Sequence, residues 1–175
     1  MVVPTGGPPA PTVGAARELH LPPRATVPTC HDEGVTVEEE VAEANLAFYA
    51  AFEARDLAAM GEVWERSNRV AVTHPGWPTL RGFDKVLSSW RAIFANTPYI
   101  QFFLTEDDVT VDGDVAWVTL YENILQEVPG SGDEGGSPEL GDSRVAATNV
   151  FCRTAGRWRM VVHHGSPVAR GFKPD

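Results

Sequence analysis

Hydrophobic residues recur at two different spacings along this chain, and the change of spacing divides the chain into two halves. Between residues 36 and 96 the apolar positions are mostly three and four residues apart, as on one face of a helix. Between residues 99 and 166 they alternate with polar positions, as in strands with one buried face. The pattern therefore predicts helices first and a sheet of consecutive strands afterwards.

Three helices are predicted in the first half. The first begins at Thr36, because Thr36 and Glu39 fit a capping box in which a hydroxyl and a carboxylate satisfy free backbone amides. Asp56 caps a short helix over residues 57–64, and a third helix covers residues 83–95. The buried face of the first helix is formed by Val41, Asn45, Phe48 and Phe52.

Five strands are predicted, one of them among the helices at residues 69–73. The other four cover residues 100–111, 115–128, 144–153 and 158–166. Asp112-Gly113-Asp114 joins the first two of these four, and an Asp-Gly turn between alternating runs is a strong hairpin signal. Helices followed by consecutive hairpins indicate an α+β fold, in which three N-terminal helices pack on a curved, mostly antiparallel sheet.

The ends of the chain differ from its middle. Residues 1–35 hold half of the 14 prolines, which is typical of a flexible tail. Residues 129–142 are rich in Gly, Ser, Asp and Pro, so we expect a flexible loop there. We therefore expect one domain over residues 36–168 and a short C-terminal tail over residues 169–175.

The charge and the cysteine content exclude several classes of function. A net charge of -10 opposes binding to nucleic acid or to an anionic membrane, and no apolar run is long enough to span a bilayer. The chain starts without the features of a secretory signal, and its two cysteines form neither a disulfide framework nor a zinc motif. Two cysteines of this kind are expected to be reduced thiols in a cytoplasmic protein. Nucleotide-binding motifs are also absent from the sequence, and we expect neither a cofactor nor a metal.

The last strand carries the most suggestive chemistry. With uninterrupted alternation, one face is formed by Trp158, Met160, Val162, His164 and Ser166. This face changes from apolar to polar, like the wall of a pocket, so His164 is predicted to be catalytic and Ser166 to contact a ligand. The alternative for His164 is a core histidine with a satisfied hydrogen bond. His163 is predicted to face the opposite side of the sheet.

Two further titratable residues are catalytic candidates. Glu122 shares its strand face with apolar residues, and burial of a carboxylate raises its pKa. The alternative is a buried glutamate held by an arginine such as Arg144. His74 ends a strand before a rigid loop that carries Trp77, and the alternative there is a packed corner. His74, Glu122 and His164 come from separate strands, so their spacing neither supports nor excludes a metal site.

Several other side chains are candidates for ligand binding. They are polar groups near buried faces, or tryptophans that could form apolar pocket walls. The set is Tyr49, Asn45, Trp64, Trp77, Trp90, Asn149 and Ser166. For Trp64, Trp90 and Tyr49 the simpler interpretation is a place in the core.

Local phrases of the sequence resemble the NTF2-like superfamily, and in particular its SnoaL-like branch. These phrases are Asp56–Met60 leading to Trp64, Val72–Trp77, Thr148–Phe151 and Trp158–Ser166. The resemblance covers residues 36–168 and implies a cone-shaped α+β fold. It also implies a strand ending of the form Trp-x-x-x-His-x-His-x-Ser, in which Val162 replaces the first histidine and His164 and Ser166 match the later positions.

The resemblance implies a pocket that takes a small apolar or carbonyl-bearing molecule. The expected activity is that of a cofactor-independent isomerase, cyclase or dehydratase that uses acid–base chemistry, in which Tyr49 could hydrogen-bond an oxyanion. The alternative is a non-catalytic ligand-binding or dimerisation domain. In either case the outer sheet face, with Thr119, Tyr121 and Val161, would pair two subunits into a homodimer.

Overall fold

The computed structural model of this protein describes residues 34–127, 139–169 and 171. The predicted proline-rich tail, apart from its last two residues, lies outside this part of the chain. Most of the predicted loop over residues 129–142 and the end of the C-terminal tail also lie outside it.

The helices form where the sequence predicts them. Helix α1 covers Val37–Glu53, and Thr36 caps it: Thr36 Oγ1 accepts from the Glu39 amide at 3.2 Å, and Glu39 Oε2 accepts from the Thr36 amide at 2.8 Å. Helix α2 covers Leu57–Val63 and follows the Asp56 cap, and helix α3 covers Phe83–Ala95. The local capping chemistry therefore sets the start of the first two helices.

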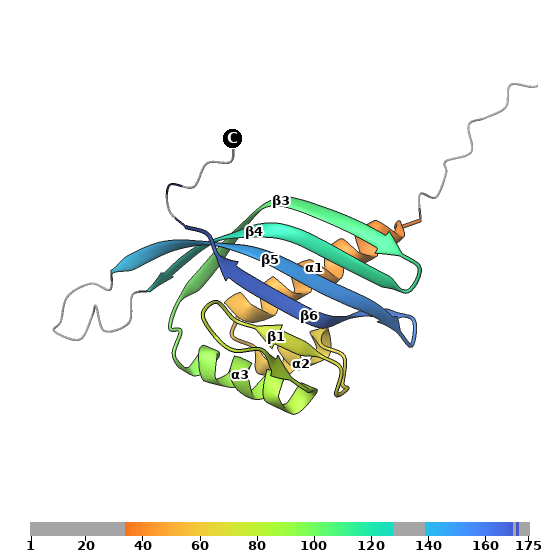
Figure 1. Ribbon diagram of the computed structural model, residues 1–175, viewed down its shortest axis with the longest axis horizontal. Helices are drawn as coiled ribbons and strands as arrows, with labels where there is room; N and C mark the ends of the chain where they lie inside the picture. Colours follow the sequence, from red (N-terminus) through yellow and green to blue (C-terminus); the bar gives the residue numbers. More distant parts are fainter. Residues whose placement is uncertain (1–33, 128–138, 170, 172–175) are drawn as a thin grey trace, which may run out of the picture. The chain divides into compact units, whose positions relative to one another are not determined.

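The strands of the described residues form one six-stranded sheet with the order β2-β1-β6-β5-β4-β3 (Figure 1). The strands are β1 Ala71–Thr73, β2 Leu80–Arg81, β3 Ile100–Asp112, β4 Val115–Glu127, β5 Leu140–Thr154 and β6 Arg157–Pro167. Only the pairing of β1 with β6 is parallel. Strand β2 was not predicted, because two residues are too short to show an alternating pattern. The predicted α+β class with helices on a curved, mostly antiparallel sheet is confirmed.

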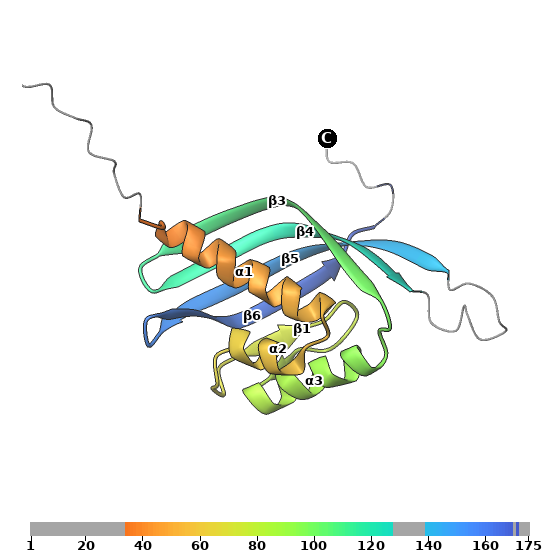
Figure 2. The same cartoon turned by 180° about the vertical axis from the view of Figure 1, so that it is seen from behind.

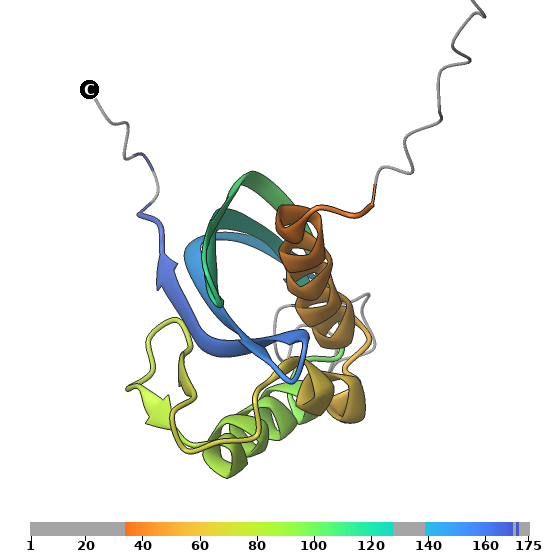
Figure 3. The same cartoon turned by 90° about the vertical axis from the view of Figure 1, so that its right-hand side faces the viewer.

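The main core lies between this sheet and the helices. Helix α1 crosses one face of the sheet (Figure 2), and the sheet curves around it (Figure 3). Phe48 of α1, Trp90 of α3 and Phe151 of β5 are fully buried there. Burial of a large side chain of this kind stabilises the fold by about 2–3 kcal/mol. Side chains that point from the inner face of the sheet therefore lie in the interior, next to α1.

A β-bulge in β6 reverses the predicted orientation of its last residues. Val150 pairs with Val162 but Phe151 pairs with Met160, so Val161 is one extra residue in β6. An extra residue moves every later side chain to the other face of the sheet. His163 is consequently buried, and His164 is exposed.

The predicted inward orientation of His164 and Ser166 is therefore wrong, as is the outward orientation of His163. Ser166 is exposed like His164. Val161, which was assigned to the outer face, is buried as well, since it follows buried Met160 directly at the bulge. Strict alternation fails here because one residue is added on β6 without a partner on β5.

Candidate functional site

Five polar side chains lie together inside the apolar core. They come from three strands and one helix, and each is at most 4% exposed. The set is Asn45 and Tyr49 of α1, Glu122 of β4, Asn149 of β5 and His163 of β6. Polar groups at this depth are stable only when they are hydrogen-bonded, so the pattern of their bonds is informative.

Asn149 is the centre of this buried network. Its Nδ2 donates to Asn45 Oδ1 at 2.7 Å and to the Tyr49 hydroxyl at 3.2 Å. Its Oδ1 lies 2.6 Å from His163 Nδ1. The Tyr49 hydroxyl in turn donates to Glu122 Oε1 at 2.7 Å. The Asn149 amide thus joins β5 to α1 and β6, and Tyr49 extends the network to β4.

The directions of these bonds assign the tautomer of His163. Since Asn149 uses its NH2 group for Asn45 and Tyr49, its Oδ1 faces His163 and can only accept. His163 Nδ1 therefore carries the proton, and Nε2 is an unprotonated acceptor. Within the described residues this Nε2 has no hydrogen-bond partner.

Burial shifts the pKa values of this group strongly. It raises the pKa of Glu122 to about 7, although the hydrogen bond from Tyr49 acts in the opposite direction. Burial and the neighbouring Glu122 charge raise the pKa of Tyr49 well above its usual value. Burial lowers the pKa of His163 to about 3, so the imidazole is neutral near pH 7. Glu122 is therefore the group of the network that changes its protonation near neutral pH.

A second buried histidine lies beside the network. His74 follows β1, where Val72 pairs with His163, so alternation places His74 on the same inner face as His163. Ser89 Oγ donates to the Val86 carbonyl at 2.7 Å, and His74 Nε2 therefore donates to Ser89 Oγ at 2.9 Å. Burial lowers the pKa of His74 to about 4, so this imidazole is also neutral.

Aromatic rings connect the two histidines. The Trp90 ring lies 4.5 Å from the His74 ring and 6.0 Å from the His163 ring, measured between centroids. The loop after His74 reaches the same region, because Gly165 of β6 leaves space for Pro75. A Cβ at position 165 would lie 3.2 Å from Pro75 Cδ. The loop is therefore fixed against the strand that carries His163.

The structure brings together only some of the predicted site residues. Asn45, Tyr49, Glu122 and Asn149 share one network, and His74 and Trp90 lie next to it. His164 and Ser166 lie on the outer face, Trp77 is 45% exposed, and Trp64 lines a different pocket. The predicted grouping of His74 and Glu122 with His164 does not form.

The structure also identifies the hydrogen-bond partner of the Glu122 carboxyl group. The partner of Glu122 is Tyr49, whereas Arg144 pairs with Glu106 at 3.0 Å. His163 and Ser89 were not among the predicted site residues. The double histidine in the sequence was a signal for His163, but only the bulge decides which histidine is buried. Within the described residues, no three His, Cys, Asp or Glu side chains converge as a metal site.

A groove beside the network gives it a connection to the surface. This groove of about 250 Å³ lies between α1 and the strands β3 and β4. Its lining includes Asn45, Leu46, Leu104 and Val118. Asn45 belongs to both the groove and the network, and Leu104 pairs in register with Glu122. A small molecule in the groove would therefore lie next to the buried polar group.

These features define a class of small α+β protein with a buried titratable network under one helix. The model of the SnoaL-like domain family matches residues 41–170, and the chain belongs to this family. The predicted resemblance is thereby confirmed. None of the described helices is long and apolar enough to cross a membrane.

The proteins similar to this chain carry names with different roles. A provisionally assigned dehydratase of the NTF2-like family from Streptomyces avermitilis is 44% identical, with 74% of this chain and 95% of that chain covered and a TM-score of 0.68. A provisionally assigned calcium/calmodulin-dependent protein kinase type II association domain from Thiobacillus denitrificans is 33% identical, with 73% and 94% covered and a TM-score of 0.61.

A further similar protein comes from a plant. The F-box protein SKIP8 of Arabidopsis thaliana is 31% identical over 124 residues, which are 70% of this chain and 47% of the plant protein. The chain thus spans about half the length of this curated relative. The names of the similar proteins give different roles. Membership of the family therefore establishes the fold, and the function has to be inferred from the side chains of the site.

Proposed function

We propose that this protein is a cofactor-independent enzyme that moves protons on a small apolar carbonyl compound, with Glu122 as the proton-transfer group. The observation that carries the proposal is the buried Glu122 carboxyl, whose pKa is raised to about 7. A general base is most effective when its pKa lies near the working pH. The 44% identity to the provisionally assigned dehydratase supports the same class of reaction.

The proposed reaction uses groups that are already in the network. Glu122 takes a proton from the carbon next to a carbonyl group, which leaves an enolate. For isomerisation, Glu122 returns this proton to another carbon. For dehydration, the bond from carbon to a β-hydroxyl breaks, and the hydroxyl leaves as water with the proton from Glu122. Tyr49 holds the carboxyl group in place through its hydrogen bond.

The substrate would enter through the groove between α1 and β3. Leu46, Leu104 and Val118 give the groove an apolar lining, which suits an apolar compound. Leu104 lines the groove and pairs with Glu122 on the neighbouring strand, so a compound in the groove would approach the carboxyl group from the side of Leu104.

Replacement of Glu122 by Gln should lower the rate of proton exchange at the carbon next to a carbonyl at least about 100-fold, because a general base contributes that much or more. The measurement is deuterium uptake from D2O into a panel of apolar β-hydroxy ketones, followed by proton NMR. Glu43→Gln is the matched control, since Glu43 is an exposed glutamate of α1. Absence of exchange by the wild type, or equal exchange by Glu122→Gln, would contradict the proposal.

A second candidate function is self-association, and the outer sheet face supports it. Trp117, Val150 and Val162 pair in register across β4, β5 and β6 and lie half-buried on the face away from α1. Phe103 on the neighbouring strand is 53% exposed. Such a row of apolar side chains suits a symmetric contact between two copies. The 33% identity to an association domain agrees with this candidate.

Val150→Arg should convert a homodimer into a monomer, because it places a charge in the middle of this apolar row. Size-exclusion chromatography with light scattering measures the mass of the particle directly. Val35→Arg is the control, because Val35 is 61% exposed and lies before α1, outside the sheet. A wild-type monomer at micromolar concentration, or a dimer that survives Val150→Arg, would rule out this face.

A further inference from the structure

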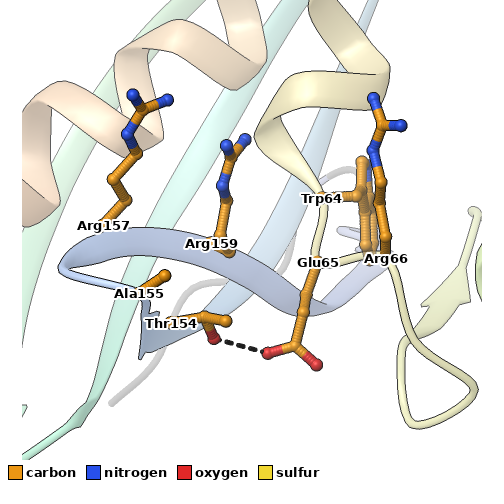
Figure 4. Close-up of a pocket in the computed structure, with 7 residues that line it drawn as sticks. All are labelled: Trp64, Glu65, Arg66, Thr154, Ala155, Arg157 and Arg159. Atoms are coloured by element: carbon orange, nitrogen blue, oxygen red, sulfur yellow. Dashed lines mark hydrogen bonds between the residues drawn. The ribbon is translucent and has the colours of Figure 1, made fainter.

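A pocket apart from the buried network gathers arginine side chains. It encloses about 390 Å³ between the segment after α2 and the β5–β6 hairpin, and its lining includes Trp64, Arg66, Arg157 and Arg159 (Figure 4). Three guanidinium groups in one pocket are unexpected in a chain with a net charge of -10. This concentration of positive charge is not used by the function proposed above.

Most of the positive charge in this pocket is not neutralised by neighbouring carboxylates. Glu62 is shared, at 2.6 Å from Arg66 and 3.4 Å from Arg159. Arg157 makes no ion pair or hydrogen bond with any described residue. One carboxylate therefore faces three guanidinium groups, which leaves about two positive charges.

Glu65, the acidic residue that lines the pocket, is paired with residues other than these three arginines. Glu65 accepts from Arg69 Nε at 2.7 Å and from Thr154 Oγ1 at 2.7 Å. The hydrogen bonds from Arg69 lower the pKa of Glu65 to about 2, so it is ionised and its charge is matched by Arg69. In Figure 4 the three guanidinium groups extend to one side of β6, and the Glu65 carboxylate lies on the other side beside Thr154.

We propose that this pocket binds the phosphate group of a small phosphorylated compound or free phosphate. Guanidinium groups bind phosphate oxygens through paired N–H donors, and the residual charge matches a dianion. Figure 4 shows the three arginines in a row, with Arg159 between Arg157 and Arg66, so the phosphate would be held by neighbouring arginines of β6 and of the segment after α2. Trp64 supplies an apolar wall for the organic part of the ligand.

The test is a titration of the full chain with inorganic phosphate and with glycerol 3-phosphate at constant ionic strength, followed by amide NMR. We expect saturable shifts at Thr154 and Arg157, and at least about tenfold weaker binding for Arg157→Gln, because it removes charge-assisted hydrogen bonds. Arg157 is exposed, so this variant should keep the fold. Arg91→Gln, at an exposed arginine of α3, should bind like the wild type.

The order of affinities identifies the source of the phosphate. Tighter binding of glycerol 3-phosphate indicates an organic phosphate, and tighter binding of inorganic phosphate indicates the free ion. Absence of saturable shifts, or equal weakening in Arg157→Gln and Arg91→Gln, would overturn the proposal, since the second result reflects the overall charge alone. Neither result depends on Glu122.

Discussion

The free energy of unfolding of the wild-type protein, taken relative to that of Glu122→Gln, should fall by about 2–3 kcal/mol when the pH is raised from about 5 to about 8. The pKa of Glu122 is about 7 in the folded protein, against an ordinary value of 4.5. The folded state therefore holds the proton more tightly than the unfolded state. The contribution of Glu122 to stability therefore decreases as the pH rises through this window, and above it the folded protein carries a buried charge at Glu122.

The comparison with Glu122→Gln isolates this one carboxyl group. Glutamine has nearly the same shape, and its Oε1 can still accept the hydrogen bond from Tyr49. His74 and His163 also titrate differently in the folded state, because burial lowers the pKa of both. Their effect has the opposite sign, since it destabilises the protein as the pH falls, but it is present in both proteins and cancels in the difference.

The measurement is urea unfolding of both proteins across this range of pH, with Glu43→Gln as a third protein. Glu43 is exposed, so the difference between Glu43→Gln and the wild type should stay constant with pH. If the difference between the wild type and Glu122→Gln also stays constant, Glu122 titrates as in water. The proposed proton-transfer role then loses its main support.

Replacement of Asn149 by Ala should lower the free energy of unfolding by about 4 kcal/mol. Asn149 is fully buried and makes hydrogen bonds to Asn45, Tyr49 and His163. Alanine removes all three bonds and leaves the His163 Nδ1 proton without an acceptor. A buried polar group that loses its partner costs about 1–3 kcal/mol, so several such groups produce an unusually large effect.

Chemical denaturation at neutral pH measures this loss, and Asn123→Ala is the matched control. Asn123 is a half-buried asparagine that donates to the Phe103 carbonyl at 2.8 Å, and we expect its loss to cost only about 1 kcal/mol. A second readout is the tautomer of His163, followed by nitrogen NMR. In the wild type Nδ1 should carry the proton, and the variant should lose this preference. Equal effects of the two substitutions would show that Asn149 is not the centre of the network.

Much of the fold could be predicted because it follows from local chemistry. Thr36 and Glu39 fix the start of α1 through bonds between neighbours in the sequence. The helical and alternating patterns predicted all three helices and five of the six strands of the described part. Glu122 could be assigned to the inner face because β4 alternates without a break along its pairing with β5.

The orientation of the site residues on β6 was predicted less well, because this strand contains one residue more than its pairing with β5 requires. The backbone of β6 takes up an extra residue at Val161, and the pattern of Trp158 to Ser166 carries no sign of it, because Met160, Val161 and Val162 are all apolar. The bulge is a property of the pairing between β6 and β5, which the alternation within β6 alone does not show. His163 therefore replaces His164 as the buried histidine.

The sequence by itself determined the class of fold, the family and the two faces of β4, because these depend on periodicity and on short-range capping. Only the tertiary structure decided which polar residues meet. Asn45 and Asn149 are 104 residues apart in the sequence, yet they are joined by a hydrogen bond. The face on which each histidine lies depends on strand register, and register is a property of two paired strands rather than of one.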